Sequence, residues 1–174
     1  MKRTGHVSLV LALGLLPFLP GPCGDDSSFE GQRLSGSVSS LEELATEVLA
    51  GLASADTSRL EAVRLTEHEH NELVWPELPG GQAGSGFPVD IAWRNITLRN
   101  RAALDRLLPL YRGRDLSVVD VECLGETAEF ESFRVRTDCR VTLELDGERL
   151  SPRQLFRDVL VWDGEHKIFR YYEP

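Results

Sequence analysis

FRVRTDCRVTLELD, residues 133–146, is the stretch that decides the fold, because polar and apolar residues alternate along it. A period of two puts successive side chains on opposite faces of a β-strand, so the pattern predicts a long strand with one buried face. That face carries an aromatic residue, a threonine, a cysteine and aliphatic residues, namely Phe133, Val135, Thr137, Cys139, Val141, Leu143 and Leu145.

The alternation continues through the last third of the chain and predicts a sheet. The expected strands cover residues 116–123, 130–146, 155–162 and 167–172. Asp146-Gly147 and Asp163-Gly164 are typical of two-residue hairpin turns. We therefore expect consecutive strands to pair in an antiparallel meander.

Helices are predicted in front of the sheet by capping signals and by apolar residues at helical spacing. Ser40 with Glu43, and Thr66 with Glu69, have the spacing of a capping box. The helix that follows Thr66 should end before Pro76, because a proline disfavours the helical conformation of the residue that precedes it. The predicted helices cover residues 40–53, 56–63, 66–76 and 88–113.

Helices first and an antiparallel sheet last indicate the α+β class. The order of elements, the WPELP stretch at 75–79 and the DGEHKIF stretch at 163–169 resemble the nuclear transport factor 2 like (cystatin-like cone) superfamily. More narrowly, the chain is similar to uncharacterised exported bacterial lipoproteins of that shape. The resemblance implies N-terminal helices packed on a curved, cone-shaped antiparallel sheet over residues 40–174. Relatives include isomerases, dehydratases and non-enzymatic binding domains, so it implies a fold rather than one function.

The N-terminus has the pattern of an export signal. A basic start, an apolar run too short to span a bilayer and two prolines predict a signal peptide at residues 1–22. Cys23 follows directly, and this arrangement resembles a bacterial lipoprotein precursor, in which the cysteine carries the lipid. Pro20 and Pro22 depart from that pattern, so an ordinary secreted protein is the alternative. We expect an exported protein anchored in the bacterial cell envelope, with a flexible tether at 23–39 and one folded domain at 40–174.

Lipidation of Cys23 would leave Cys123 and Cys139 as a pair, each on the apolar face of a predicted strand. In an oxidising compartment such a pair can form a lasting bridge, so we predict a disulfide. Two buried free thiols are the alternative.

Composition limits the partners. The 174 residues carry a formal net charge of −9, and Lys2 and Arg3 lie in the leader, which has no acidic residue. An acidic chain lacks the basic footprint that a nucleic acid or an anionic bilayer requires, so neither is expected as the main partner. Attachment to the membrane through the lipid on Cys23 needs no such footprint, and no cofactor is expected.

The most suggestive polar residues lie in the third predicted helix. His68 and Glu72 share a helix face and could hold a metal, but no third ligand is identifiable, so a solvated face is preferred and no metal is expected.

Function is left between three hypotheses, of which a non-catalytic domain that binds an apolar small molecule or an envelope protein is preferred. An aromatic set could line its pocket: Trp93, Tyr111, Phe133, Trp162, Phe169 and Tyr171. An isomerase-like or dehydratase-like enzyme would need a buried acid, for which Asp90, Asp120 and Tyr111 are the candidates. A structural subunit would use an apolar sheet face as its interface.

Overall fold

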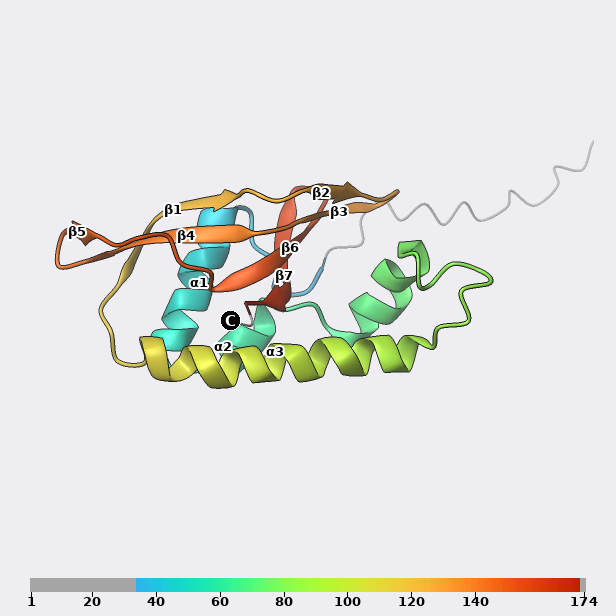
Figure 1. The fold of residues 1–174 in the computed structure, drawn as a ribbon, viewed down its shortest axis with the longest axis horizontal. Coiled ribbons are helices and arrows are strands. Elements are labelled where there is room, and N and C mark those ends of the chain that lie inside the picture. Colours follow the sequence, from blue (N-terminus) through green and yellow to red (C-terminus); the bar gives the residue numbers. More distant parts are fainter. Residues whose placement is uncertain (1–33, 173–174) are drawn as a thin grey trace, which may run out of the picture. The chain divides into compact units, whose positions relative to one another are not determined.

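The computed structural model describes residues 34–172, which lie in one compact unit (Figure 1). The predicted signal peptide, Cys23 and the tether before residue 34 lie outside the described residues. The helices are α1 (Leu41–Ser54), α2 (Thr57–Ala62), a π-helix η1 (Glu69–Val74), a 3-10 helix η2 (Trp75–Glu77) and α3 (Val89–Tyr111). The strands are β1 (Ser117–Cys123), β2 (Thr127–Glu129), β3 (Phe133–Arg136), β4 (Cys139–Leu145), β5 (Glu148–Arg149), β6 (Phe156–Trp162) and β7 (Glu165–Tyr171).

The α+β class is confirmed, whereas the simple meander is wrong. The strands form two antiparallel sheets, one in the order β1-β4-β5 and the other in the order β2-β3-β6-β7. β1 pairs with β4 because the hairpin of β2 and β3 is inserted between them in the chain. Both predicted hairpin turns are confirmed, since Asp146, Gly147, Asp163 and Gly164 all have positive φ.

The long strand predicted over 130–146 is broken in two. Asp138 adopts a left-handed conformation with φ of 50°, and the chain passes there from β3 in one sheet to β4 in the other. The predicted buried face survives the break, but Phe133 and Val135 enter a different apolar cluster from Cys139.

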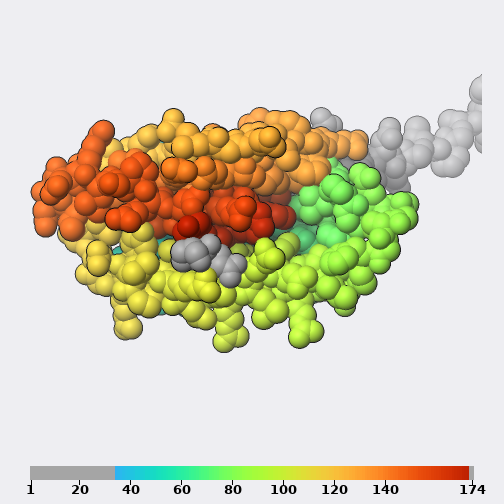
Figure 2. All heavy atoms as spheres, in the orientation of Figure 1, coloured from blue at the N-terminus to red at the C-terminus, as the bar shows by residue number. Residues whose placement is uncertain are grey.

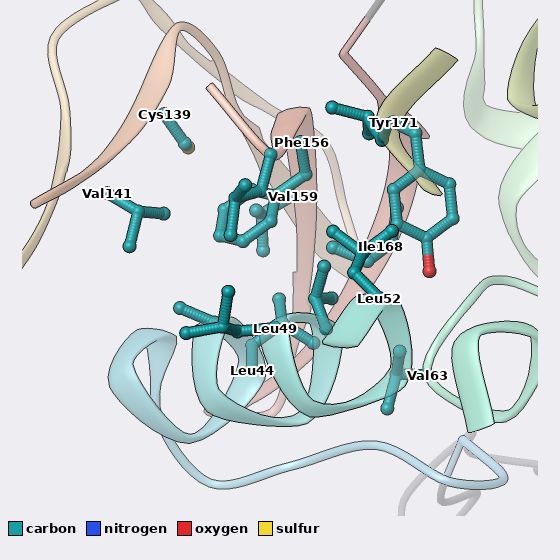
Figure 3. Close-up of a cluster of buried hydrophobic side chains, with 14 of the residues drawn as sticks. Leu44, Leu49, Leu52, Val63, Cys139, Val141, Phe156, Val159, Ile168 and Tyr171 are labelled. Carbon is teal, nitrogen blue, oxygen red and sulfur yellow. The ribbon is translucent and has the colours of Figure 1, made fainter. Parts of the chain in front are cut away.

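The larger cluster fills the space between α1, α3 and the sheets (Figure 3). Leu44, Leu49 and Leu52 of α1 point toward the strand residues Val159 and Ile168. All five are almost completely excluded from solvent. The space between the helices and the sheets is therefore filled by packed apolar side chains.

A smaller cluster covers the other face of β6. Leu160 and Trp162 point into it and meet Leu73 and Val74 of η1, while Val159 and Val161 belong to the larger cluster. Burial on both faces explains why β6 has a continuous apolar run instead of an alternation.

Both capping boxes contribute helix caps. The Ser40 hydroxyl accepts from Glu43 N, and Thr66 and Glu69 bond reciprocally, each side chain accepting from the backbone N–H of the other. The expectation that helical structure ends before Pro76 is wrong. Trp75 is helical, with φ of −56° and ψ of −42°, and the proline is tolerated because it occupies the first turn of the 3-10 helix.

The outer edge of β7 is covered along its length. Val38 forms an antiparallel bridge with His166, and Arg64 a parallel bridge with Ile168. Beyond them the Asn100 side chain takes the place of a strand, accepting from Tyr171 N and donating to the carbonyl of residue 169. The edge is thereby closed to pairing with another chain. Residues 34–39, which we assigned to the tether, belong to the fold through these contacts.

The predicted disulfide is confirmed: Cys123 and Cys139 are bonded. The two residues are direct cross-strand partners in the β1–β4 pair, so the bridge fastens β1 to the strand that leaves the break at Asp138.

Candidate functional site

Helix α3 presents one continuous stripe to the rest of the fold, and the stripe changes character along its length. Residues at alternating spacings of four and three form it: Trp93, Thr97, Asn100, Leu104, Leu107 and Tyr111. The second half is apolar and belongs to the larger core cluster. The first half carries polar groups, and in Figure 1 it lies beside η1. Apolar packing does not explain polar residues on the inward face of a helix, so this half of α3 is a candidate for a functional role.

A row of rings leads from the surface to a buried cation beside this polar half. Phe87 is 47% exposed and lies 6.0 Å from Trp75, measured between ring centroids. Trp75 lies 5.7 Å from His70, and His70 lies 5.3 Å from Trp93. The guanidinium carbon of Arg64 lies 5.3 Å from the Trp93 ring centroid on this row, within the range of a cation–π contact. We call these five residues the aromatic row.

Buried polar atoms without a partner gather around Trp93. Within the described residues they include Arg64 Nη1 and His70 Nε2, whose side chains both contact Trp93, and Thr97 Oγ1, one helical turn along α3. The other two such atoms are Asp158 Oδ1 and His166 Nδ1. A buried donor or acceptor left unpaired costs about 1–3 kcal/mol, so this group is expensive for the fold to keep. Buried polar groups of this kind call for a partner from outside the chain, such as a ligand, an ion or a water molecule.

His70 has a defined role in this group. Its Nδ1 lies 2.7 Å from Asn71 Oδ1, so Nδ1 carries the proton and donates. Burial lowers the pKa of His70, which outweighs the opposing effect of the Asn71 hydrogen bond and of Glu67. The imidazole is therefore neutral near pH 7, and its Nε2 is left as a hydrogen-bond acceptor.

A buried ion pair lies next to the row. Lys167 Nζ is 2.7 Å from Glu69 Oε2, with the two side chains 0% and 6% exposed, and Nζ also donates to the carbonyl of Ser35. Burial alone would raise the pKa of Glu69, but hydrogen bonds from Lys167 and from backbone N–H groups bring it below its ordinary value. Burial lowers the pKa of Lys167, the charge of Arg64 adds to that effect, and Glu69 opposes it.

The π-helix η1 has one buried and one exposed side. Glu69, His70, Leu73 and Val74 are buried together, whereas His68 and Glu72 are exposed, as expected for a solvated face. Single π-helical turns are rare and are frequent at functional sites. Among residues 34–172, no group of three metal-ligating side chains comes together.

Signals for the missed residues were present but weak. The capping box predicted that the Glu69 carboxylate bonds to Thr66 N, which turns that carboxylate toward the fold. The alternation along β7 places Lys167 on the same face as Phe169. A charged group on that face requires a buried partner. Nothing in the local pattern distinguished Arg64 and Thr97 from ordinary surface residues.

The predicted aromatic set is divided over several places. Phe133 and Trp162 stack 6.1 Å apart in the smaller cluster, and Phe169 packs against that cluster. Tyr171 is in the larger cluster, where its hydroxyl donates to the Leu60 carbonyl 2.7 Å away and burial raises its pKa. Of the six predicted ligand-binding residues, Trp93 is the one in contact with the unpaired polar atoms.

The candidates for acid–base chemistry are also apart. Asp90 and Asp120 are exposed, the first in the opening turn of α3 and the second on β1. Tyr111 lies at the opposite end of α3 from Asp90, about 30 Å along a helix of this length. Burial raises the pKa of Tyr111.

Tyr111 borders a groove of about 450 Å³ between the end of α3 and the strands. Its other walls include Leu110, Arg140, Arg153 and Tyr172. In Figure 2 the yellow end of α3 lies below the orange and red segments that form these walls. The groove and the aromatic row use different parts of the α3 stripe.

The glycine-rich loop before α3 holds Trp75 in place. A Cβ atom on Gly81 would lie 1.8 Å from the Trp75 carbonyl oxygen, so the loop can pass there only as glycine. We expect Gly81→Ala to destabilise the protein by about 2 kcal/mol in urea unfolding and to shift tryptophan emission, because the backbone at Trp75 must move. Ala83→Val adds bulk to an exposed position of the same loop and should change neither quantity. Equal effects of the two substitutions would contradict the close contact.

The fold and site together define an α+β domain with a buried polar and aromatic cluster. Comparison with family models, with curated proteins and with solved structures finds no match to this chain. The resemblance to the cone superfamily therefore stays a prediction. The residues 34–172 include no helix with the length and apolar character needed to cross a membrane.

Proposed function

We propose that this chain is an exported protein, held at the cell envelope by a lipid on Cys23, whose folded domain binds a small carboxylate-bearing molecule without reacting with it. Export and the anchor rest on the sequence of residues 1–23 alone. The binding function rests on one observation: the side chains of Arg64 and His70, each with an unpaired buried atom, contact Trp93, and the unpaired Thr97 Oγ1 lies one helical turn along α3.

The chemistry of these atoms selects the ligand class. Arg64 Nη1 and the Thr97 hydroxyl can donate to a carboxylate, and a guanidinium donor makes such a bond strong. His70 Nε2 can accept from a hydroxyl or amine elsewhere on the ligand. Trp93 and Trp75 offer flat apolar surface for the remainder of the molecule, the combination that small-molecule sites usually have. The carboxylates of Asp90 and Asp120 are exposed, and the buried carboxylates of Glu69 and Asp158 are held in ion pairs with Lys167 and Arg170. Neither arrangement suits an isomerase-type base, which favours binding over catalysis.

Access to the row would run through the loop before α3. Residues 82–87 are exposed, and Phe87 at the end of that segment contacts Trp75. Movement of this segment would open the outer end of the aromatic row while the helices stay in place.

Benzoate and benzamide form a matched pair of probes, because they share a ring and differ in the charged group. We expect benzoate to change tryptophan emission on titration and benzamide to bind at least tenfold more weakly. Arg64→Met should weaken benzoate binding by roughly 10- to 100-fold, the value of a hydrogen bond to a charged group. Arg59→Met, which removes an exposed arginine of α2, should leave it unchanged. Equal binding of the two probes, or of the Arg64 variant and the native protein, would refute the proposal.

Thr97 gives a test in which stability and binding move in opposite directions. Thr97→Val keeps the side-chain shape but removes the unpaired Oγ1, so the free energy of unfolding should rise by about 1 kcal/mol. The same substitution should weaken benzoate binding, because a donor is lost.

Thr46→Val is the control for that test. The Thr46 hydroxyl is exposed and already donates to the Glu42 carbonyl, so no gain in stability is expected in urea unfolding. A loss of stability in Thr97→Val would mean that Oγ1 is paired in solution, and the site would lose one of its donors.

A further inference from the structure

The solvent face of α3 has an arrangement that the ligand site does not explain. At 100° per residue, Ile91 and Leu98, which are 44% and 56% exposed, fall on one outward line, and this line continues to the exposed Asp105. Arg94 and Arg101 lie on one side of this line and Arg99 on the other, all exposed. An apolar line flanked on both sides by arginines is typical of a helix that lies in the surface of a bilayer.

The charge of this face is opposite to that of the chain. α3 carries four arginines and two aspartates, whereas the whole chain has a net charge of −9. Within residues 34–172, Arg94, Arg99 and Arg101 form no ion pair with another side chain. Their guanidinium groups are therefore available to an external anion. The net charge argues against an anionic surface as a partner, but the segregation of charge supplies the local basic footprint that such a surface needs.

The position of α3 leaves this face uncovered by the described elements. Figure 1 shows α3 along one side of the folded unit with both sheets on its other side. In Figure 2 side chains of the yellow-green helix project outward along that edge. Because the stripe of Trp93 to Tyr111 faces inward, the outward line can make contacts without disturbing the core.

We propose that the outer face of α3 docks on an anionic lipid bilayer, with the helix parallel to the membrane plane. Ile91 and Leu98 enter the boundary between headgroups and acyl chains, and the flanking arginines bind lipid phosphates while their stems stay along the apolar line. Charge complementarity and the exposed apolar residues at the centre of the basic face select a bilayer over an acidic protein. The inference is independent of the ligand site and of lipidation at Cys23.

Vesicle binding by the full chain carrying Cys23→Ser tests it, since no lipid is then attached and any contribution of the leader is the same in every variant. We expect binding to vesicles that mix phosphatidylglycerol with phosphatidylcholine, and little binding to phosphatidylcholine alone. Arg94→Glu with Arg101→Glu should weaken binding by roughly 20-fold or more, since each arginine near an anionic surface strengthens binding about fivefold. Arg134→Glu with Arg149→Glu is the control, because it makes the same change in net charge on exposed positions of β3 and β5. This pair should weaken vesicle binding by less than about twofold.

A second matched pair tests the apolar line. Leu98 and Leu124 are both 56% exposed, but only Leu98 is on α3. Leu98→Asn should weaken vesicle binding by roughly tenfold, and Leu124→Asn should not change it. Absence of binding by the parent chain, equal binding to both kinds of vesicle, or equal loss in both arginine pairs would overturn the proposal. Loss in the α3 arginine pair without loss in Leu98→Asn would also overturn it, since that result indicates adsorption to the charged headgroups without entry of the apolar residues.

Discussion

Lys167→Met is expected to lower the free energy of unfolding by about 3 kcal/mol. The substitution keeps an unbranched side chain in the space but removes the cation that faces Glu69 at 2.7 Å. A buried carboxylate that loses its partner costs about 3–5 kcal/mol. The lower end applies because the carboxylate keeps hydrogen bonds from Thr66 N, Ser35 N and the Ser35 hydroxyl. Urea unfolding monitored by tryptophan emission measures the change.

The double variant separates the charge from the shape. Glu69→Gln with Lys167→Met removes both charges while the glutamine carbonyl still accepts from Thr66 N. We expect the double variant to lie within about 1 kcal/mol of the native protein, because buried ion pairs add little over neutral groups that fit. The difference between the sum of the single substitutions and the double one gives the interaction energy of the pair.

The exposed pair Arg59–Glu47 is the control. Its N···O distance is also 2.7 Å, but the two side chains are 42% and 32% exposed. Arg59→Met should cost less than about 1 kcal/mol. The two pairs therefore differ in burial at equal distance, and equal costs would show that Glu69 is not held in a dry environment.

The features of the fold that could be predicted from the sequence are those that depend on residue polarity and on turn chemistry. The alternation over 133–146 selected five buried residues correctly, and Thr137 and Leu145 are partly buried. Hydrophobic burial depends on which side a side chain points, whatever sheet the strand joins. The break at Asp138 escaped prediction since a left-handed aspartate leaves no mark in the alternation. β2 was missed because all of its residues are exposed, so it has no alternation to detect.

The candidate site could be predicted only in part. Trp93 was found by its size and its place in an amphipathic helix. Glu69 and His70 were missed because the spacing of His68 and Glu72 drew the prediction to the exposed side of this helix, and the buried side was assigned to packing. Arg64 and Lys167 come together from segments far apart in the chain, and a single sequence carries no signal for such a contact.

Reduction of the disulfide is expected to lower the free energy of unfolding by about 3 kcal/mol. Cys123 and Cys139 are 16 residues apart, and a bridge of that span restricts the unfolded chain by about this amount in the chain-entropy model. Since the effect acts on the unfolded state, reduction should also increase the dependence of the unfolding free energy on urea, because the released chain expands. Urea unfolding of the same protein with and without a thiol reductant measures both quantities.

The Cys123→Ala and Cys139→Ala double variant is the control for the reductant. Cys23 then remains without an intramolecular partner, so reductant should have no effect on this variant. Its stability should fall below that of the reduced protein, because Cys139 is fully buried and alanine leaves a small cavity in the larger cluster. A mass showing free thiols at both Cys123 and Cys139, or a reduction that leaves both the unfolding free energy and its urea dependence unchanged, would mean that β1 is held to β4 by its hydrogen bonds and packing alone.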